Sequence, residues 1–469
     1  MVFSSSVFLF LFLPIIWILY TLIPVRYIST KNTLLGVASI LFYAFGEPIY
    51  LLLMLGSIIF NYFAAVWIAK TGDRTGTVVC VFSVFVNLAL LCLFKYSPWL
   101  TDTFNKALRC SLSVPVFTIP VGISFYTFQI LSYVVDVKNR KTPVQKNILN
   151  LLLYISFFPQ LIAGPIVKYS DIQEQIGFRA VTAQKTAHGL RRFIYGLTKK
   201  LIVSNTAAVI ADAAFGSTEM SSCFAWAGAM CYCIQLYFDF SGYSDMAIGL
   251  AEIFGFSICE NFNYPYSAVS IRDFWKRWHI SLTTWFREYV YFPLGGNRCG
   301  SVRTVVNRIF VFFLTGLWHG ANFTFIVWGL WHGLLMMFEQ FVHFDRIAQK
   351  RVLRPVTRIY TLLCVCLGFV VFRAPSLSEA IHFIGTMFSF GSSGADALIY
   401  FSPFVCLILA CGVIFSCPVL PWLRRKASEN EKSAKIFDVI EYLIALPAFL
   451  LCIMQISSST FNPFIYYNF

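Results

Sequence analysis

Long apolar runs separated by short polar loops make up most of the chain. They lie at residues 7–24, 33–46, 49–69, 77–94, 116–135, 147–167, 201–215, 224–256, 309–341, 359–373, 398–421 and 437–456. A helix needs about 20 apolar residues to cross the ~30 Å hydrocarbon core of a bilayer. The pattern therefore predicts an all-α, polytopic membrane protein with about eleven full crossings. Because no low-complexity linker divides the chain, we expect one integral domain over residues 1–469.

The basic residues lie between the apolar runs, chiefly in 168–200 and 272–308. The positive-inside rule assigns such loops to the cytoplasm, which predicts that the N-terminus lies outside. No charged segment precedes 7–24, so we expect a retained first helix rather than a signal peptide. If the basic loops are all cytoplasmic, residues 147–167 must enter and leave the membrane on the same side. We therefore expect a re-entrant segment there, broken at Pro159 and Pro165.

Composition supports a membrane location, since 58% of the residues are hydrophobic, 12% are charged and the formal net charge is +14. These values are outside the range of soluble globular domains. We expect contact with a lipid bilayer and none with nucleic acid. The basic stretch 168–200, which contains His188 and Arg192, is predicted to anchor at lipid headgroups. The fourteen cysteines, mostly inside apolar runs, are assigned to packing.

A repeated pentad places two histidines within the apolar run 309–341. Gly-Leu-Trp-His-Gly occurs around His319 and again around His332. Ionisable side chains at membrane depth usually have a function. A helix that starts after Arg308 would carry His319 ~16 Å into the bilayer, at ~1.5 Å per residue. His319 is therefore the first candidate for a reacting group, with access expected from the cytoplasm or the exterior.

The residues after each pentad distinguish the two histidines. Gly320 and Asn322 predict a helix break that exposes His319 to a cavity, whereas the apolar run continues after His332. We therefore expect His332 to be a hydrogen-bonded packing residue beside the site. In each pentad the glycines are four apart, a spacing that allows another backbone to approach closely. No metal site is expected, because His-x-x-x-His spacing and clustered acids are missing from the sequence.

Residues 272–289 carry aromatic and apolar side chains at helical spacing, which predicts one continuous helix. The stripe consists of Trp275, Trp278, Leu282, Trp285 and Tyr289. A basic stripe beside it has two interpretations. It could belong to an interfacial helix whose cations reach the headgroups, or it could form the wall of a cytosolic pocket for an anionic ligand.

Two carboxylates, Asp239 and Asp245, lie within the apolar run 224–256. Buried carboxylates require partners, and the expected ones are Arg272, Lys276 or Arg277. The acids would then clamp the basic helix to the bundle or position substrate. A serine hydrolase site at Ser241 is not favoured, because the sequence lacks Gly-x-Ser-x-Gly after a strand.

Several motifs resemble the membrane-bound O-acyltransferase (MBOAT) family, within it the branch of the alginate O-acetyltransferase membrane subunit and related wall and exopolysaccharide acetylation proteins. The resemblance covers essentially the whole chain. The motifs occupy residues 122–129, 157–166, 237–245, 272–298, 317–320 and 464–469.

The resemblance implies a funnel-shaped helical bundle in a bacterial inner membrane, with His319 and His279 as catalytic residues. It implies an O-acyltransferase that takes acetyl from cytosolic acetyl-CoA, a substrate rather than a bound cofactor. An extracytoplasmic serine esterase-like (SGNH) partner would complete O-acetylation of peptidoglycan or an exopolysaccharide. The residue type of His319 allows either general-base catalysis or a covalent acyl-imidazole.

Expected substrate contacts are Trp318, Asp239, Ser241, Asp245, Lys276, Arg277, Asn322 and His332. Two other classes remain compatible with the residues alone: a transporter or flippase that uses the intramembrane acids and His319, and a scaffold for polysaccharide export.

Overall fold

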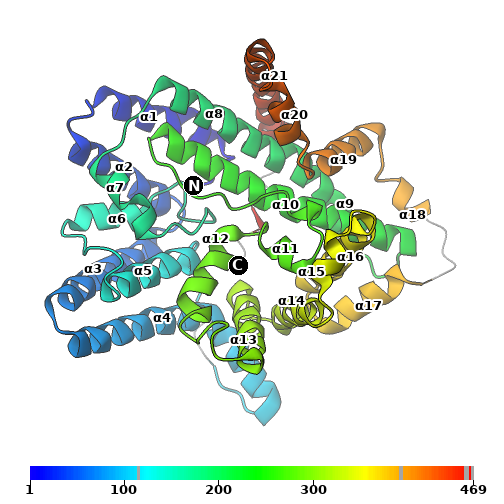
Figure 1. The fold of residues 1–469 in the computed structure, drawn as a ribbon, viewed down its shortest axis with the longest axis horizontal. Helices are drawn as coiled ribbons and strands as arrows, with labels where there is room; N and C mark the ends of the chain where they lie inside the picture. The colour runs from blue at the N-terminus through cyan, green and yellow to red at the C-terminus, as the bar shows by residue number, and fades with distance from the viewer. Residues whose placement is uncertain (114–116, 390–394, 459–463, 466–469) are drawn as a thin grey trace. The chain divides into compact units, whose positions relative to one another are not determined.

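The computed structural model describes the chain except residues 114–116, 390–394, 459–463 and 466–469, and its described part is all helical (Figure 1). The chain divides into two compact units. Unit 1 contains Met1–Phe193 and Ser244–Cys259, and unit 2 contains Ile194–Tyr243 and Glu260–Ile465. This division does not test the prediction of a single domain.

Unit 1 is built from the N-terminal helices. Their bounds are η1 (Phe8–Phe12, a π-helical turn), α1 (Leu13–Leu22), α2 (Ile28–Ala44), α3 (Pro48–Lys70), α4 (Asp73–Leu108), α5 (Ile123–Lys138), α6 (Ile148–Ser156) and α7 (Tyr169–Gly177). Helices α8 (Ala183–Thr198) and α10 (Ser222–Ile253) contribute residues to both units.

Unit 2 holds the rest of the described chain. Its first elements are η2 (Lys199–Ser204), α9 (Asn205–Gly216), η3 (Pro265–Ser267), α11 (Ile271–Trp275), α12 (Ile280–Phe286), η4 (Arg287–Tyr291), α13 (Ser301–His319) and α14 (Phe323–Phe341). They are followed by α15 (Phe344–Gln349), α16 (Arg354–Arg373), α17 (Leu377–Met387), α18 (Ala395–Leu398), α19 (Pro403–Phe415), α20 (Val419–Ala427) and α21 (Glu431–Ser458).

Among the described residues, four helices are long and apolar enough to cross a membrane: α3, α4, α16 and α21. The count becomes five if the bent pair α19 and α20 forms one span. The predicted number of eleven is not reached on this criterion, partly because some expected spans are short. The run 7–24, for example, forms a continuous apolar helix of η1 and α1, Phe8–Leu22, that is too short to be counted.

The predicted break inside 147–167 is confirmed. Helix α6 ends at Ser156, and the residues that follow turn back without forming a helix. Gln160 stabilises this turn, since its side chain donates a 2.6 Å hydrogen bond to the carbonyl oxygen of Tyr154. A Cβ on Gly164 would lie 2.5 Å from Cα of Gln160, so the tight turn requires glycine there.

The prediction of one helix over 272–289 is wrong. The stripe is buried at Trp275, Trp278, Leu282 and Trp285, as expected, but α11 ends at Trp275 and α12 begins only at Ile280. Between them His279 adopts φ 45° and ψ 54°, a left-handed conformation that interrupts an α-helix. The two short helices are therefore joined by a sharp corner at His279.

Helices α8 and α10 approach closely through glycines. In unit 1, a Cβ on Gly189 would lie 2.5 Å from the carbonyl oxygen of Gly249. In unit 2, a Cβ on Gly242 would lie 2.7 Å from the carbonyl oxygen of Gly196. Backbone contact of this kind brings the side chains beside the glycines within hydrogen-bonding distance across the helix pair.

Candidate active site

The α13–α14 hairpin is held by the first glycines of the two pentads. A Cβ on Gly316 would lie 2.3 Å from the carbonyl oxygen of Phe325, and a Cβ on Gly329 would lie 2.3 Å from that of Phe312. Any larger residue would separate the helices, so the predicted close approach at these glycines is confirmed.

His319 is the last residue of α13, and the predicted break follows it at Gly320. Its side chain is 3% exposed. The imidazole centroid lies 4.9 Å from the ring of Trp318, 5.0 Å from that of Trp328 and 5.3 Å from that of Phe372. The prediction that the break exposes His319 to a cavity is therefore wrong: aromatic rings enclose the imidazole, and substrate would reach it only if some of them moved.

His279 is fully buried and is oriented by Asn261. The Oδ1 atom of Asn261 accepts from the backbone N–H of Ser281 at 3.2 Å and from its hydroxyl at 2.9 Å. The same oxygen lies 3.2 Å from Nδ1 of His279. Because this oxygen can only accept, Nδ1 carries the proton and Nε2 keeps the lone pair. Burial lowers the pKa of His279 to about 3, so the ring is neutral.

Trp318 links the two expected catalytic histidines. Its ring centroid lies 6.1 Å from that of His279 and 4.9 Å from that of His319. Although 40 positions apart in the sequence, both imidazoles therefore pack on one indole within unit 2. This arrangement could support proton transfer or substrate orientation between the two imidazoles.

His332 differs from its prediction. The side chain is fully buried, but neither ring nitrogen has a hydrogen-bond partner among the described residues. It packs instead between Trp275 and Trp328, at 5.3 and 5.4 Å between centroids. Helix α16 approaches so closely that a Cβ on Gly368 would lie 2.9 Å from Nε2 of His332. His332 is a packing residue, and its expected contact with substrate stays a prediction.

The partners predicted for Asp239 and Asp245 are wrong. In unit 2, Asp239 pairs with Lys200 at 2.5 Å, and the other carboxylate oxygen accepts from the backbone N–H of Ile465 at 2.9 Å. In unit 1, Asp245 accepts from Arg192 at 2.9 Å. The acids hold α8 and η2 rather than the 272–289 segment, because the glycine contacts place those elements beside α10.

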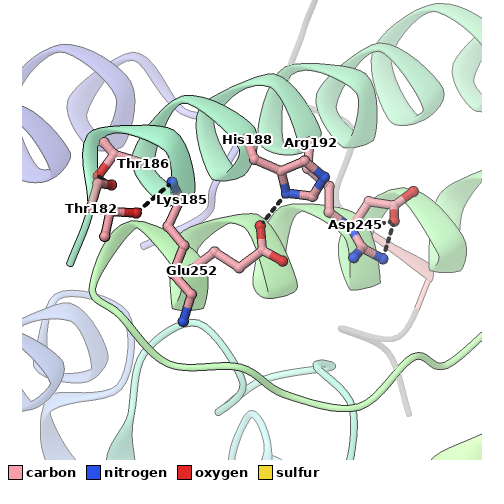
Figure 2. Close-up of polar contacts among 7 residues, drawn as sticks. All are labelled: Thr182, Lys185, Thr186, His188, Arg192, Asp245 and Glu252. Atoms are coloured by element: carbon pink, nitrogen blue, oxygen red, sulfur yellow. Dashed lines mark hydrogen bonds and ion pairs between the residues drawn. The ribbon is translucent and has the colours of Figure 1, made fainter. Parts of the chain in front are cut away.

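Figure 2 shows a second contact between α8 and α10 in unit 1, between His188 and Glu252, with the ring Nδ1 2.6 Å from a carboxylate oxygen. The side chains of His188 and Arg192 in this view point from α8 toward α10. The predicted lipid anchor at 168–200 is therefore corrected for His188 and Arg192, whose side chains contact carboxylates of α10.

A basic cavity of about 620 Å³ opens on the surface of unit 2. Its charged lining consists of Arg272, Asp273, Lys276, Arg277, Asp345, Arg354 and Arg358. Arg272 pairs with Asp345 and Arg277 with Asp273. Lys276, Arg354 and Arg358 have no ion-pair partner within the described part of the chain. This excess of positive charge favours the pocket interpretation of the basic stripe over the interfacial helix.

Sequence reasoning missed Arg354 and Arg358. They lie four residues apart on α16, so both face the cavity from one side of that helix. The i, i+4 spacing at the start of an apolar run was the available signal. Neither His279 nor His319 lines this cavity.

The remaining expected contacts are spread over unit 2. Ser241 is buried, and its hydroxyl makes no hydrogen bond with a described residue. Asn322 caps α14 by accepting from the N–H of Thr324, and it donates to the carbonyl of Pro375. The cap gives Asn322 a structural role, and a role of either residue toward substrate stays a prediction.

Comparison with known proteins identifies the family. Residues 86–378 match the model of the membrane-bound O-acyltransferase family, MBOAT. The chain belongs to this family. It is 44% identical to the "probable alginate O-acetylase AlgI" of Pseudomonas aeruginosa over 84% of this chain and 76% of that protein. A protein of the same name from Pseudomonas putida is 39% identical over the full length of both chains.

The peptidoglycan O-acetyltransferase of Helicobacter pylori is 35% identical over 82% of this chain and 80% of that protein. The protein is thus a membrane-embedded O-acyltransferase, as the motifs predicted, and the transporter and scaffold alternatives lose their support.

Proposed function

We propose that this MBOAT protein takes acetyl from cytosolic acetyl-CoA and passes it across the bacterial inner membrane for O-acetylation of a cell-surface polysaccharide. The relatives named for alginate and peptidoglycan acetylation support polysaccharide as the acceptor. The observation that carries the proposal is the shared contact of His279 and His319 with Trp318. An extracytoplasmic partner of the serine esterase (SGNH) type would complete the transfer.

The donor would bind with its phosphates in the basic cavity. Cations without acidic partners suit phosphate oxygens, and a volume of about 620 Å³ is typical of a small-molecule site. Trp275 adjoins Lys276 in sequence and lies 5.7 Å from Trp328, which in turn contacts His319. The thioester arm would pass these two indoles, and their movement would open the way to His319.

At the site, a ring nitrogen of neutral His319 would take the proton of the attacking hydroxyl. The hydroxyl oxygen would bond to the thioester carbonyl carbon, the C–S bond would break, and the thiolate would leave and take up a proton. Alternatively, His319 would attack first and form an acyl-imidazole that the hydroxyl then cleaves. Trapping of acetylated His319 by mass spectrometry would support the second route.

The membrane arrangement belongs to the same proposal. We place the N-terminus outside, the segment 147–167 as a re-entrant element, and about eleven crossings in total. The buried turn after α6 supports the re-entrant element. Cysteine-accessibility labelling that finds 147 and 167 on opposite sides of the membrane would contradict it.

Charge reversal in the basic cavity should weaken donor binding. We expect Lys276→Glu, Arg277→Glu or Arg358→Glu to raise the acetyl-CoA concentration that gives half-maximal turnover by about tenfold, the effect of roughly one charge-assisted contact. Turnover in membranes is measured against acetyl-CoA concentration. Arg303→Glu, an exposed basic residue on α13 that does not line the cavity, is the control. An unchanged requirement in all three variants would assign these side chains to lipid contact.

The tautomer of His279 should depend on Asn261. Asn261→Ala removes the acceptor for Nδ1–H and is expected to reduce turnover, whereas Asn261→Asp retains it. The new carboxylate would stabilise the protonated imidazolium and raise the pKa of His279 from about 3. As the pH is lowered, Asn261→Asp would therefore lose turnover at a higher pH than the unsubstituted protein does.

The dependence of the turnover rate of Asn261→Asp on pH tests the direction of this pKa shift. Asn263→Ala, at an exposed neighbouring position, is the matched control and should leave the profile unchanged. If Asn261→Asp and the unsubstituted protein lose turnover at the same acidic pH, His279 takes no part in turnover.

A further inference from the structure

Unit 1 contains two cations, Lys31 and Arg179, that lie against one tyrosine ring. Each residue is 4% exposed. The Lys31 Nζ atom is 4.2 Å from the centroid of the Tyr20 ring, and Cζ of Arg179 is 5.7 Å from the same centroid. No carboxylate pairs with either cation within the described part of the chain. Two buried like charges without a counter-charge are strongly unfavourable, so this arrangement requires an explanation.

The hydrogen bonds of Arg179 are all to neutral groups. Nε lies 2.9 Å from the hydroxyl of Tyr20 and 3.1 Å from the carbonyl oxygen of Phe254. Nη1 donates to Oδ1 of Asn32 at 2.7 Å and to the carbonyl oxygen of Gln175 at 3.1 Å. Nη2 has no partner among the described residues. The guanidinium also lies over the ring of Phe256, with Cζ 4.2 Å from its centroid. In the described part of the chain it therefore keeps two N–H groups without an acceptor and has no carboxylate as counter-charge.

Lys31 also lacks hydrogen-bond acceptors and a counter-charge among the described residues. Its ammonium makes no hydrogen bond or ion pair with a described residue. Lys31 lies in the first turns of α2, whose N-cap residue Tyr27 provides no side-chain cap. The free first-turn N–H groups of this 17-residue helix add to the positive potential at the same end.

We propose that Lys31, Arg179 and the N-terminus of α2 bind a phosphate-type oxyanion. Such an anion supplies the missing negative charge and accepts several N–H bonds at once. Two sources share this chemistry: the headgroup of an anionic phospholipid and a soluble phosphate. The loops before α2 and after α7 fall on the side that the positive-inside rule assigns to the cytoplasm, where anionic headgroups are abundant. This site is independent of the histidines of unit 2.

The test uses the purified full chain in phosphate-free detergent solution, with the thermal midpoint as readout. One series adds dioleoylphosphatidylglycerol, with dioleoylphosphatidylcholine as the control lipid. The other adds sodium phosphate, with sodium chloride at equal ionic strength as the control salt. A midpoint raised by phosphatidylglycerol identifies a lipid headgroup, and one raised by phosphate identifies a soluble anion. Lys31→Met should require about tenfold more of the same ligand. Arg140→Gln, at an exposed cation paired with Asp73, should match the unsubstituted protein.

The direction in which the ligand-free thermal midpoint changes distinguishes an anion-binding role of Lys31 from a purely packing role. Without ligand, Lys31→Met should raise the midpoint, because it removes one of two neighbouring like charges. Arg179→Lys keeps the charge but loses Nη2, and it should also weaken ligand binding. The proposal is overturned if neither phosphatidylglycerol nor phosphate raises the midpoint, if both variants respond like the unsubstituted protein, or if Lys31→Met lowers the ligand-free midpoint.

Discussion

Replacement of His319 by alanine is expected to abolish acetyl transfer while leaving the protein abundant in the membrane. His319 ends α13 and is enclosed by Trp318, Trp328 and Phe372. The loss of a general base alone lowers a rate by ~10²–10⁴, and the loss of a covalent nucleophile removes the route altogether. The measurement is O-acetyl content of the cell-surface polysaccharide in cells that depend on the variant, with membrane abundance from an immunoblot.

The control is His382→Ala, which removes an exposed imidazole on α17 and should leave acetylation unchanged. Retained acetylation in His319→Ala would refute the catalytic assignment. Lost acetylation together with lost membrane abundance would assign His319 to folding instead, because its ring fills an aromatic enclosure.

Loss of one partner of the Lys200–Asp239 pair is expected to have the largest effect on stability. The side chains are 2% and 1% exposed, and their charged atoms lie 2.5 Å apart. Lys200→Met would leave a buried carboxylate without its cation, which costs about 3–5 kcal/mol. We expect a large fall in the thermal midpoint of the detergent-solubilised protein.

The double variant Lys200→Met/Asp239→Asn should recover part of that loss, because the amide is neutral and still accepts from the backbone N–H of Ile465. Lys435→Met, which removes an exposed i, i+4 pair with Glu431, should change the midpoint little. A double variant that is less stable than Lys200→Met would show that the pair is not held mainly by mutual charge neutralisation.

Local sequence signals were sufficient for the α13–α14 hairpin. The end of α13 at His319 follows from Gly320 and Asn322, and the close approach of the two helices follows from the glycine spacing of the pentads. The turn after Ser156 was also predictable, because Pro159 and Pro165 cannot continue a helix. In each case the determining residues lie within a few positions of the feature.

The corner at His279 was not predictable from spacing. The apolar stripe keeps helical periodicity across the break, since both short helices bury the same kind of face. The break is stabilised by Asn261, 18 positions earlier, whose side chain holds both His279 and Ser281. Likewise, composition could show that Asp239 and Asp245 need cations but not which ones. The choice of Lys200 and Arg192 depends on the backbone contacts of α8 with α10.

The two identical pentads end in different electrostatic surroundings. His319 closes α13, where the last carbonyl groups have no further N–H donors along the helix, whereas His332 lies in the middle of α14. Those carbonyl dipoles give a partial negative charge to the helix end that carries the first imidazole. When that ring accepts a proton, the helix terminus stabilises the resulting imidazolium without a carboxylate. A neighbouring backbone could thus perform the task that an acidic side chain performs in a catalytic triad.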